Sequence, residues 1–104
     1  MPQVKHVVLL RLKADIGQNE IDAIFSDLAD LKNDISGIID FSGGPYSSSE
    51  GLNKGFTHGF VTTFINEASR DAYLSHPAHE AVKKALIHAL DGGLDGVVAF
   101  DWLS

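Results

Sequence analysis

The sequence predicts an α+β fold, a two-layer sandwich in which helices cover one face of a four-stranded antiparallel sheet. Segments in which apolar residues alternate with period two occur near both ends of the chain and in its middle, and segments with helical spacing separate them. The 104 residues, of which 44% are hydrophobic and 21% charged, suit one globular domain. We therefore expect a single domain over residues 1–104.

The first strand is predicted in VKHVVLLRLK, residues 4–13. His6 shares the mainly apolar face of this segment, and Val7 and Leu9 lie between charged residues on the other face. A strand with apolar residues on both faces is usually covered on both sides. A small domain leaves much of its surface exposed, so a second copy of the chain would suit the outer face.

Helical spacing follows over residues 18–32, where the apolar residues that recur are Ile21, Ile24, Phe25, Leu28 and Leu31. A β-prone segment at residues 38–42 comes next. The stretch GGPYSSSEGLNKG is rich in turn-forming residues and predicts a long loop.

The clearest strand is FTHGFVTTF, residues 56–64, with His58 on its apolar face. Asn66 can cap a second helix, and Pro77 interrupts the chain near His76 and starts a third helix running to about Leu90.

The segment GVVAFDWL closes the chain as the last strand, with Val98, Phe100 and Trp102 on one face. The predicted order of elements is βαββ(αα)β. This order is typical of a ferredoxin-like sandwich.

Composition excludes several classes of function. A formal charge of −6 and the absence of a basic run argue against nucleic acid as a partner. The chain has no cysteine, which removes disulfides and thiolate chemistry. No signal peptide is apparent, and no segment approaches the roughly 18 apolar residues of a membrane helix. We expect a cytoplasmic protein without a membrane partner.

Four residues could form an acid–base site. His6 and His58 lie on the strand faces that helices should cover, whereas Tyr73 and His79 are separated by the break at Pro77. In one unbroken helix, six positions would rotate two side chains by roughly 240°, so the break allows them to converge. Imidazole would then serve as the base, and the phenol as an acid or oxyanion donor.

Other interpretations remain open for each residue. His6 and His58 could be hydrogen-bonded core residues, and Tyr73 a core aromatic residue. His76 could simply start a helix, and His76 and His79 lack the i, i+4 spacing and intervening glutamate of a helical zinc motif. A binding or structural protein without enzymatic activity is the alternative function.

Several motifs together resemble the stress-responsive A/B barrel (Dabb) family: VKHVVLLRLK, GFTHGFVTTF, YLSHPAHEAV and VVAFDW. The resemblance implies a ferredoxin-like monomer that pairs into a dimeric α/β barrel. One plant member closes a linear polyketide by aldol condensation with a histidine and a tyrosine. Its pocket residues fall on His6, His58, Tyr73 and His79 here.

From these observations we expect a homodimer that binds a small, partly apolar organic ligand, with cyclase- or isomerase-like acid–base activity. His79 and Tyr73 are the expected catalytic residues, and His6, His58 and His76 the expected ligand-binding residues. No metal and no cofactor are expected.

Overall fold

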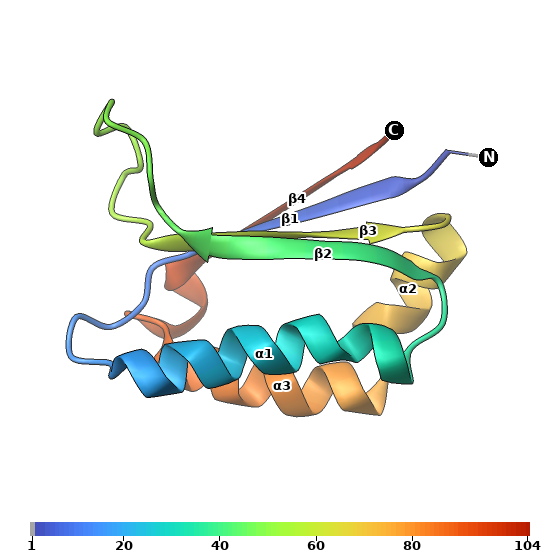
Figure 1. Cartoon of the computed structure of the whole chain (residues 1–104), viewed down its shortest axis with the longest axis horizontal. Helices are drawn as coiled ribbons and strands as arrows, with labels where there is room; N and C mark the ends of the chain where they lie inside the picture. Colours follow the sequence, from blue (N-terminus) through green and yellow to red (C-terminus); the bar gives the residue numbers. More distant parts are fainter. Residues whose placement is uncertain (1) are drawn as a thin grey trace.

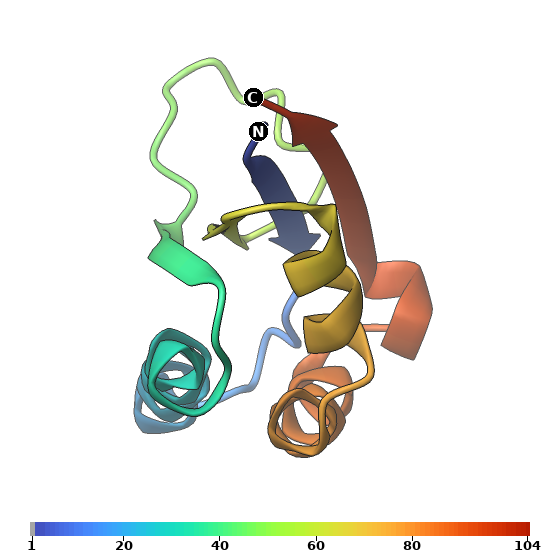
Figure 2. The ribbon, with the colours of Figure 1, turned by 90° about the vertical axis from the view of Figure 1, so that its right-hand side faces the viewer.

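The computed structural model describes residues 2–104. Over this range the elements are β1 (Val4–Leu10), α1 (Gln18–Asp34), β2 (Ile38–Pro45), β3 (His58–Phe64), α2 (Glu67–Leu74), α3 (Pro77–Ala89), the 3₁₀ turn η1 (Gly93–Gly96) and β4 (Val97–Leu103). The strands form one antiparallel sheet in the order β2-β3-β1-β4. Helices lie below a single face of the sheet (Figure 1, Figure 2). The predicted ferredoxin-like class is confirmed.

The covered face of the sheet forms the core with α1. Helix α1 buries Ile24, Leu28 and Leu31, which recur at helical spacing. The strands supply the fully buried Val4, Leu10 and Phe64 among others, and α2 adds Tyr73. The alternation expected for β1 is visible in its burial, because every second residue from Val4 to Leu10 is buried.

Side-chain caps explain where the two later helices begin. The Asn66 side chain accepts a hydrogen bond from the Ser69 backbone N–H at the start of α2. His76 caps α3 through its ring, and Pro77 occupies the first turn of that helix. The break predicted from Pro77 is therefore present, and it turns the chain between α2 and α3.

Two strands are shorter than predicted. β1 ends at Leu10, because the Arg11 backbone N–H bonds to Gly96 and the chain leaves the sheet toward α1. β3 begins at His58, because Phe56 closes a turn on the Asn53 carbonyl. Sequence alternation runs through both strand ends and detects neither the long-range bond of Arg11 nor the local turn at Phe56. The turn η1 was not predicted.

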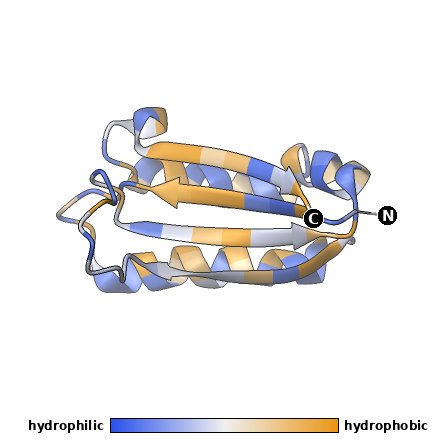
Figure 3. Cartoon of the chain, turned by 90° about the horizontal axis from the view of Figure 1, so that it is seen from above, coloured by the Kyte–Doolittle hydropathy of each residue, from blue (hydrophilic) through white to orange (hydrophobic). Residues whose placement is uncertain are grey.

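The other face of the sheet is uncovered in the single chain. Seen from that side, hydrophobic residues run along much of β4 and of its neighbour β1 (Figure 3). Phe100 is 65% exposed, and Val98, Trp102 and Leu9 are also exposed there. The loop of residues 46–57 rises above this face at the end of β2 (Figure 1). Among residues 2–104, none of the helices combines the length and apolarity that a membrane crossing requires.

Candidate functional site

His6 is held by a carboxylate on the neighbouring strand. The antiparallel register places His6 opposite Asp101 on β4, and the His6 Nδ1 atom lies 2.7 Å from Asp101 Oδ1. The second carboxylate oxygen accepts a hydrogen bond of 2.8 Å from Arg70 on α2. With both oxygens of Asp101 engaged, the His6 ring is fixed in orientation and its Nε2 atom is left for other partners.

An aromatic cluster surrounds His6 on the covered face of the sheet. The His6 ring packs edge-on against Tyr73 at 5.9 Å between centroids, and also against Phe60 and Phe64. Tyr73 in turn lies 4.2 Å from the ring of His79 at the start of α3. Three of the predicted site residues, His6, Tyr73 and His79, therefore converge, as the helix break at Pro77 allows.

A cavity of about 200 Å³ borders this cluster and has both His6 and His79 in its wall. The remainder of the wall is almost entirely apolar and comes from the sheet, from α1 and from the length of α3. Ligand pockets are usually larger, at roughly 300 Å³ or more, so this cavity suits a small molecule. Tyr73 is only 1% exposed and lies behind the two histidines.

The buried groups have altered acidities. Burial lowers the pKa of His79, an effect that Lys83 and His6 reinforce and that the Leu74 backbone and Glu80 partly offset. The His79 Nδ1 atom is buried and has no hydrogen-bond partner among residues 2–104. Burial raises the pKa of Tyr73 to about 12, against a smaller opposite effect of the Thr62 side chain. At neutral pH these values favour an uncharged imidazole beside a protonated phenol.

His76 does not line this cavity. Its ring Nδ1 accepts a hydrogen bond of 3.0 Å from the Ala78 backbone N–H at the start of α3. The side chain thus has the capping geometry that was the alternative interpretation of the sequence.

His58 lies at the other end of the sheet. Its Nδ1 atom lies 2.8 Å from the Thr57 hydroxyl, and its ring packs 5.8 Å from Phe25 of α1. Burial lowers the pKa of His58. The structure therefore does not bring His58 into the cavity of His6 and His79.

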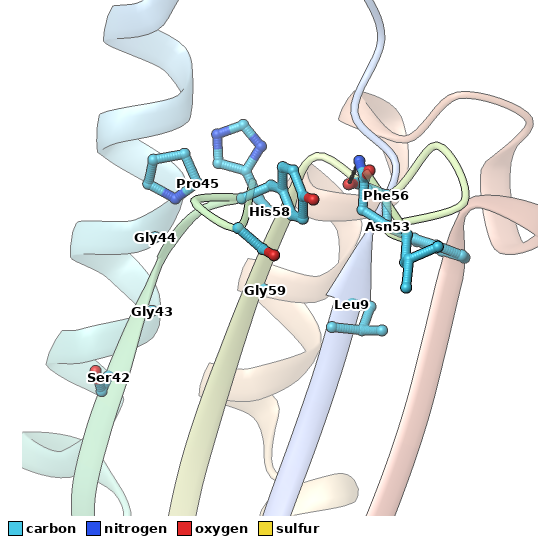
Figure 4. A pocket seen from close by; sticks show the side chains of 12 residues that line it. Leu9, Ser42, Gly43, Gly44, Pro45, Asn53, Phe56, His58 and Gly59 are labelled. Atoms are coloured by element: carbon cyan, nitrogen blue, oxygen red, sulfur yellow. Dashed lines mark hydrogen bonds between the residues drawn. The ribbon is translucent and has the colours of Figure 1, made fainter. Parts of the chain in front are cut away.

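A larger pocket, of about 590 Å³, lies beside His58 on the uncovered face of the sheet. Leu9 and Gly59 form its floor, beneath the loop that carries Asn53 and Phe56 (Figure 4). No carboxylate or cation lines it, and its one histidine is bonded to Thr57. Its size exceeds that of the cavity, but it lacks a comparable set of proton-transfer groups.

Two residues of the site were missed by the sequence analysis. Neither Asp101 nor Arg70 was given a role from the sequence. A signal for Asp101 was available, because it shares the covered face of β4 with Val97 and Ala99, where a lone carboxylate needs a partner. Arg70 carried no such signal, since its contact with Asp101 depends on how α2 packs beside the sheet. Among residues 2–104, no group of three or more metal-ligating side chains is placed to hold a metal ion.

The fold and this cluster define an α+β sandwich with histidine and tyrosine side chains buried between sheet and helices. The Dabb family, described as the stress responsive A/B barrel domain, matches residues 4–104. The stress-response A/B barrel domain-containing protein HS1 of Arabidopsis thaliana is 35% identical over 99 residues, covering 95% of this chain and 87% of that protein. The chain therefore belongs to the stress responsive A/B barrel domain family.

Two further relatives are informative. Olivetolic acid cyclase of Cannabis sativa is 29% identical over 76 residues, which cover 73% of this chain and 75% of the cyclase. A solved structure from Jannaschia, described as a dimeric ferredoxin-like protein of unknown function, matches with a TM-score of 0.80 at 28% identity. That match covers 96% of this chain and 97% of the other.

Proposed function

We propose that this chain binds a small, partly apolar carbonyl compound in the cavity beside His79 and moves a proton on it. The observation that carries the proposal is the buried Nδ1 atom of His79, which has no hydrogen-bond partner in the described chain. A buried polar atom without a partner is unfavourable by about 1–3 kcal/mol, so a ligand group that satisfies it would bind favourably.

The proposed chemistry is proton transfer next to a carbonyl group. A neutral His79 ring nitrogen takes the proton from the carbon beside the carbonyl, and the electrons of that C–H bond move to form an enolate. Tyr73 does not line the cavity, contrary to the catalytic role expected from the sequence; it packs 4.2 Å from the His79 ring and holds that ring in place. Return of the proton to another carbon gives an isomer, and attack of the enolate on a second carbonyl of the same molecule closes a ring.

His6 has a different role in this proposal. Because Asp101 engages its Nδ1 atom at 2.7 Å, the free Nε2 atom can accept a hydrogen bond from the ligand and orient it. Arg70 holds Asp101 in place, so it affects the ligand only indirectly, through Asp101 and His6. His58 and His76 lie outside the cavity, and this function does not use them.

The relationship to olivetolic acid cyclase supports the choice of chemistry, because it is 29% identical to this chain and its name describes ring closure. A sequence identity of 29% does not establish that the two proteins share a substrate. The small cavity of about 200 Å³ instead argues for a compact ligand.

We also propose that the chain forms a homodimer through the uncovered face of the sheet, as an α/β barrel. Exposed apolar side chains on β4, such as Phe100 and Trp102, form a surface that soluble monomers rarely expose. The Jannaschia relative is described as dimeric. The larger pocket beneath residues 46–57 shares Leu9 and Gly59 with this face, so a second copy would cover it.

Deuterium exchange tests the enzymatic proposal without knowledge of the natural substrate. The dimer is incubated in D₂O with 4-phenylbutan-2-one, and exchange of the protons beside the carbonyl is followed by NMR. We expect exchange above the buffer rate that is lost in His79→Gln, while ligand-induced shifts of the His6 ring signals remain. The exposed His88→Gln variant is the matched control and should exchange like the wild type.

The outcomes separate the rival functions. Ligand-induced shifts without exchange would identify a binding protein and exclude the proton-transfer role. No shifts with this ketone or with its carboxylate analogues, together with a loss of stability in His79→Gln, would identify His79 as a packing residue.

A further inference from the structure

Lys83 is the only cationic side chain in the wall of the His79 cavity described here. Apart from His6 and His79, the other lining residues are apolar, and no carboxylate is among them. Lys83 follows His79 by four positions on α3, so both side chains lie on the same face of the helix, one turn apart. A ligand that contacts His79 therefore has a positive charge one helical turn away.

The Lys83 ammonium group has no protein partner in the described structure. No ion pair or hydrogen bond joins Lys83 to another side chain within residues 2–104. Glu80, three positions earlier on α3, is the nearest candidate on the same helix, yet no ion pair joins the two. The charge acts on the site nonetheless, since Lys83 contributes to the lowered pKa of His79.

Lys83 lies at the solvent end of an apolar cavity. It is itself exposed, and Leu74 and Leu94, which also line the cavity, are 43% and 66% exposed. Water partly screens an exposed ion pair, so Lys83 should add modestly to the binding that the apolar part of a ligand supplies. Asp101, which contacts His6 of the cavity wall, is already paired with Arg70.

We propose that Lys83 selects the substrate class, namely small amphipathic carboxylates whose apolar part fills the cavity and whose carboxylate binds the Lys83 ammonium group. This inference rests on the proposed function of the cavity and adds the charge of its ligand. The rest of the molecule does not favour anions, because the chain carries a formal charge of −6. Selection for a carboxylate therefore depends on this one side chain.

Binding of two matched probes tests the role of Lys83. The affinities of 4-phenylbutanoate and of its neutral analogue 4-phenylbutanamide are measured by NMR titration with the intact protein, following the His6 and His79 ring signals. We expect the carboxylate to bind more tightly than the amide. Lys83→Met should weaken carboxylate binding about five-fold and leave amide binding within about two-fold. Added salt should weaken the binding of the carboxylate but not the binding of the amide.

Lys84→Met is the matched control. Like Lys83, Lys84 is exposed and unpaired in the described structure, and its substitution by methionine removes the same charge. Lys84 does not line the cavity. We expect this variant to bind both probes like the wild type. An equal loss of carboxylate binding in Lys84→Met would show a general charge effect and overturn the role of Lys83.

The remaining outcomes distinguish the two proposals. If both probes bind with equal affinity and Lys83→Met changes neither, the cavity remains a ligand site and the selection by Lys83 is wrong. If neither probe nor 4-phenylbutan-2-one shifts the His6 and His79 signals, the proposed site itself fails, and the selection fails with it.

Discussion

The two faces of strands β1 and β4 place very different residue pairs a few ångströms apart. On the covered face, His6 and Asp101 form a contact of 2.7 Å that Arg70 extends. On the opposite face, the next pair in the same register is Val7 with Phe100, and Phe100 is 65% exposed. Because side chains alternate along a strand, one pair of strands can supply a polar site on one face and an apolar contact surface on the other. Substitutions should therefore affect the two separately.

The largest expected effect is on assembly. Phe100→Asp places a charge between the exposed Val98 and Trp102 on β4, and an aromatic residue buried in an interface typically contributes about 2 kcal/mol or more to association. We expect the dissociation constant of the dimer to increase by at least about 30-fold. Analytical ultracentrifugation over a concentration series measures this change.

Leu94→Asp is the control for the assembly prediction. Leu94 is 66% exposed, almost the same as Phe100, but it lies in η1 and lines the cavity on the covered side of the sheet. This variant should remain as dimeric as the wild type. A dimer that survives Phe100→Asp would place the interface elsewhere.

Asp101→Asn should lower the stability of the fold by affecting the covered face. Asp101 bonds to both Arg70 and His6, and hydrogen bonds to charged groups contribute about 2 kcal/mol each. Asparagine keeps one acceptor oxygen, so one of the two bonds is lost. We expect the free energy of unfolding in urea to fall by about 2 kcal/mol. Asp71→Asn is the control, because Asp71 also contacts Arg70 at 2.8 Å but is exposed, and its loss should have little effect.

The burial of Tyr73 should make the fold less stable at alkaline pH. The phenol titrates near 10 when unfolded, and burial raises its pKa to about 12 in the folded chain. Between these values the unfolded state has lost the proton that the folded state retains, so stability falls as pH rises. We expect the wild type to lose about 1 kcal/mol more than Tyr73→Phe between pH 9 and pH 11. Parallel losses in both proteins would contradict this assignment.

The fold was predictable because alternation, helical spacing and caps are local signals. The period-two patterns in β1, β3 and β4 and the break at Pro77 can be read from neighbouring residues, and the structure has all of them. Strand ends were less accurate, because β1 ends where Arg11 bonds to the distant Gly96 and β3 begins after a turn that Phe56 closes on Asn53.

The candidate site was predictable only in part. Convergence of Tyr73 and His79 followed from the helix break, and His6 from its strand face. The positions of His58 and Arg70 depend on the register of the sheet and on the packing of α2, which no short segment encodes. His58 shares a strand face with Phe60 but lies at the other end of the sheet from His6. The alternation of residues predicts which face a side chain is on, but not how far it lies from another site residue.

The smallest expected effect is on stability in mild acid, where the folded chain keeps His79 uncharged. Burial lowers the pKa of His79 below its usual value of 6.5, so the unfolded chain binds a proton more readily than the folded one. Stability should therefore fall as pH decreases below about 6.5. We expect the free energy of unfolding, measured by urea denaturation, to depend less steeply on pH in His79→Gln than in the wild type. Substitution of the more exposed His88 should change this dependence less. If His79→Gln keeps the full slope, another buried group such as His58 controls the acid response, and the imidazole of His79 is better solvated than its surroundings indicate.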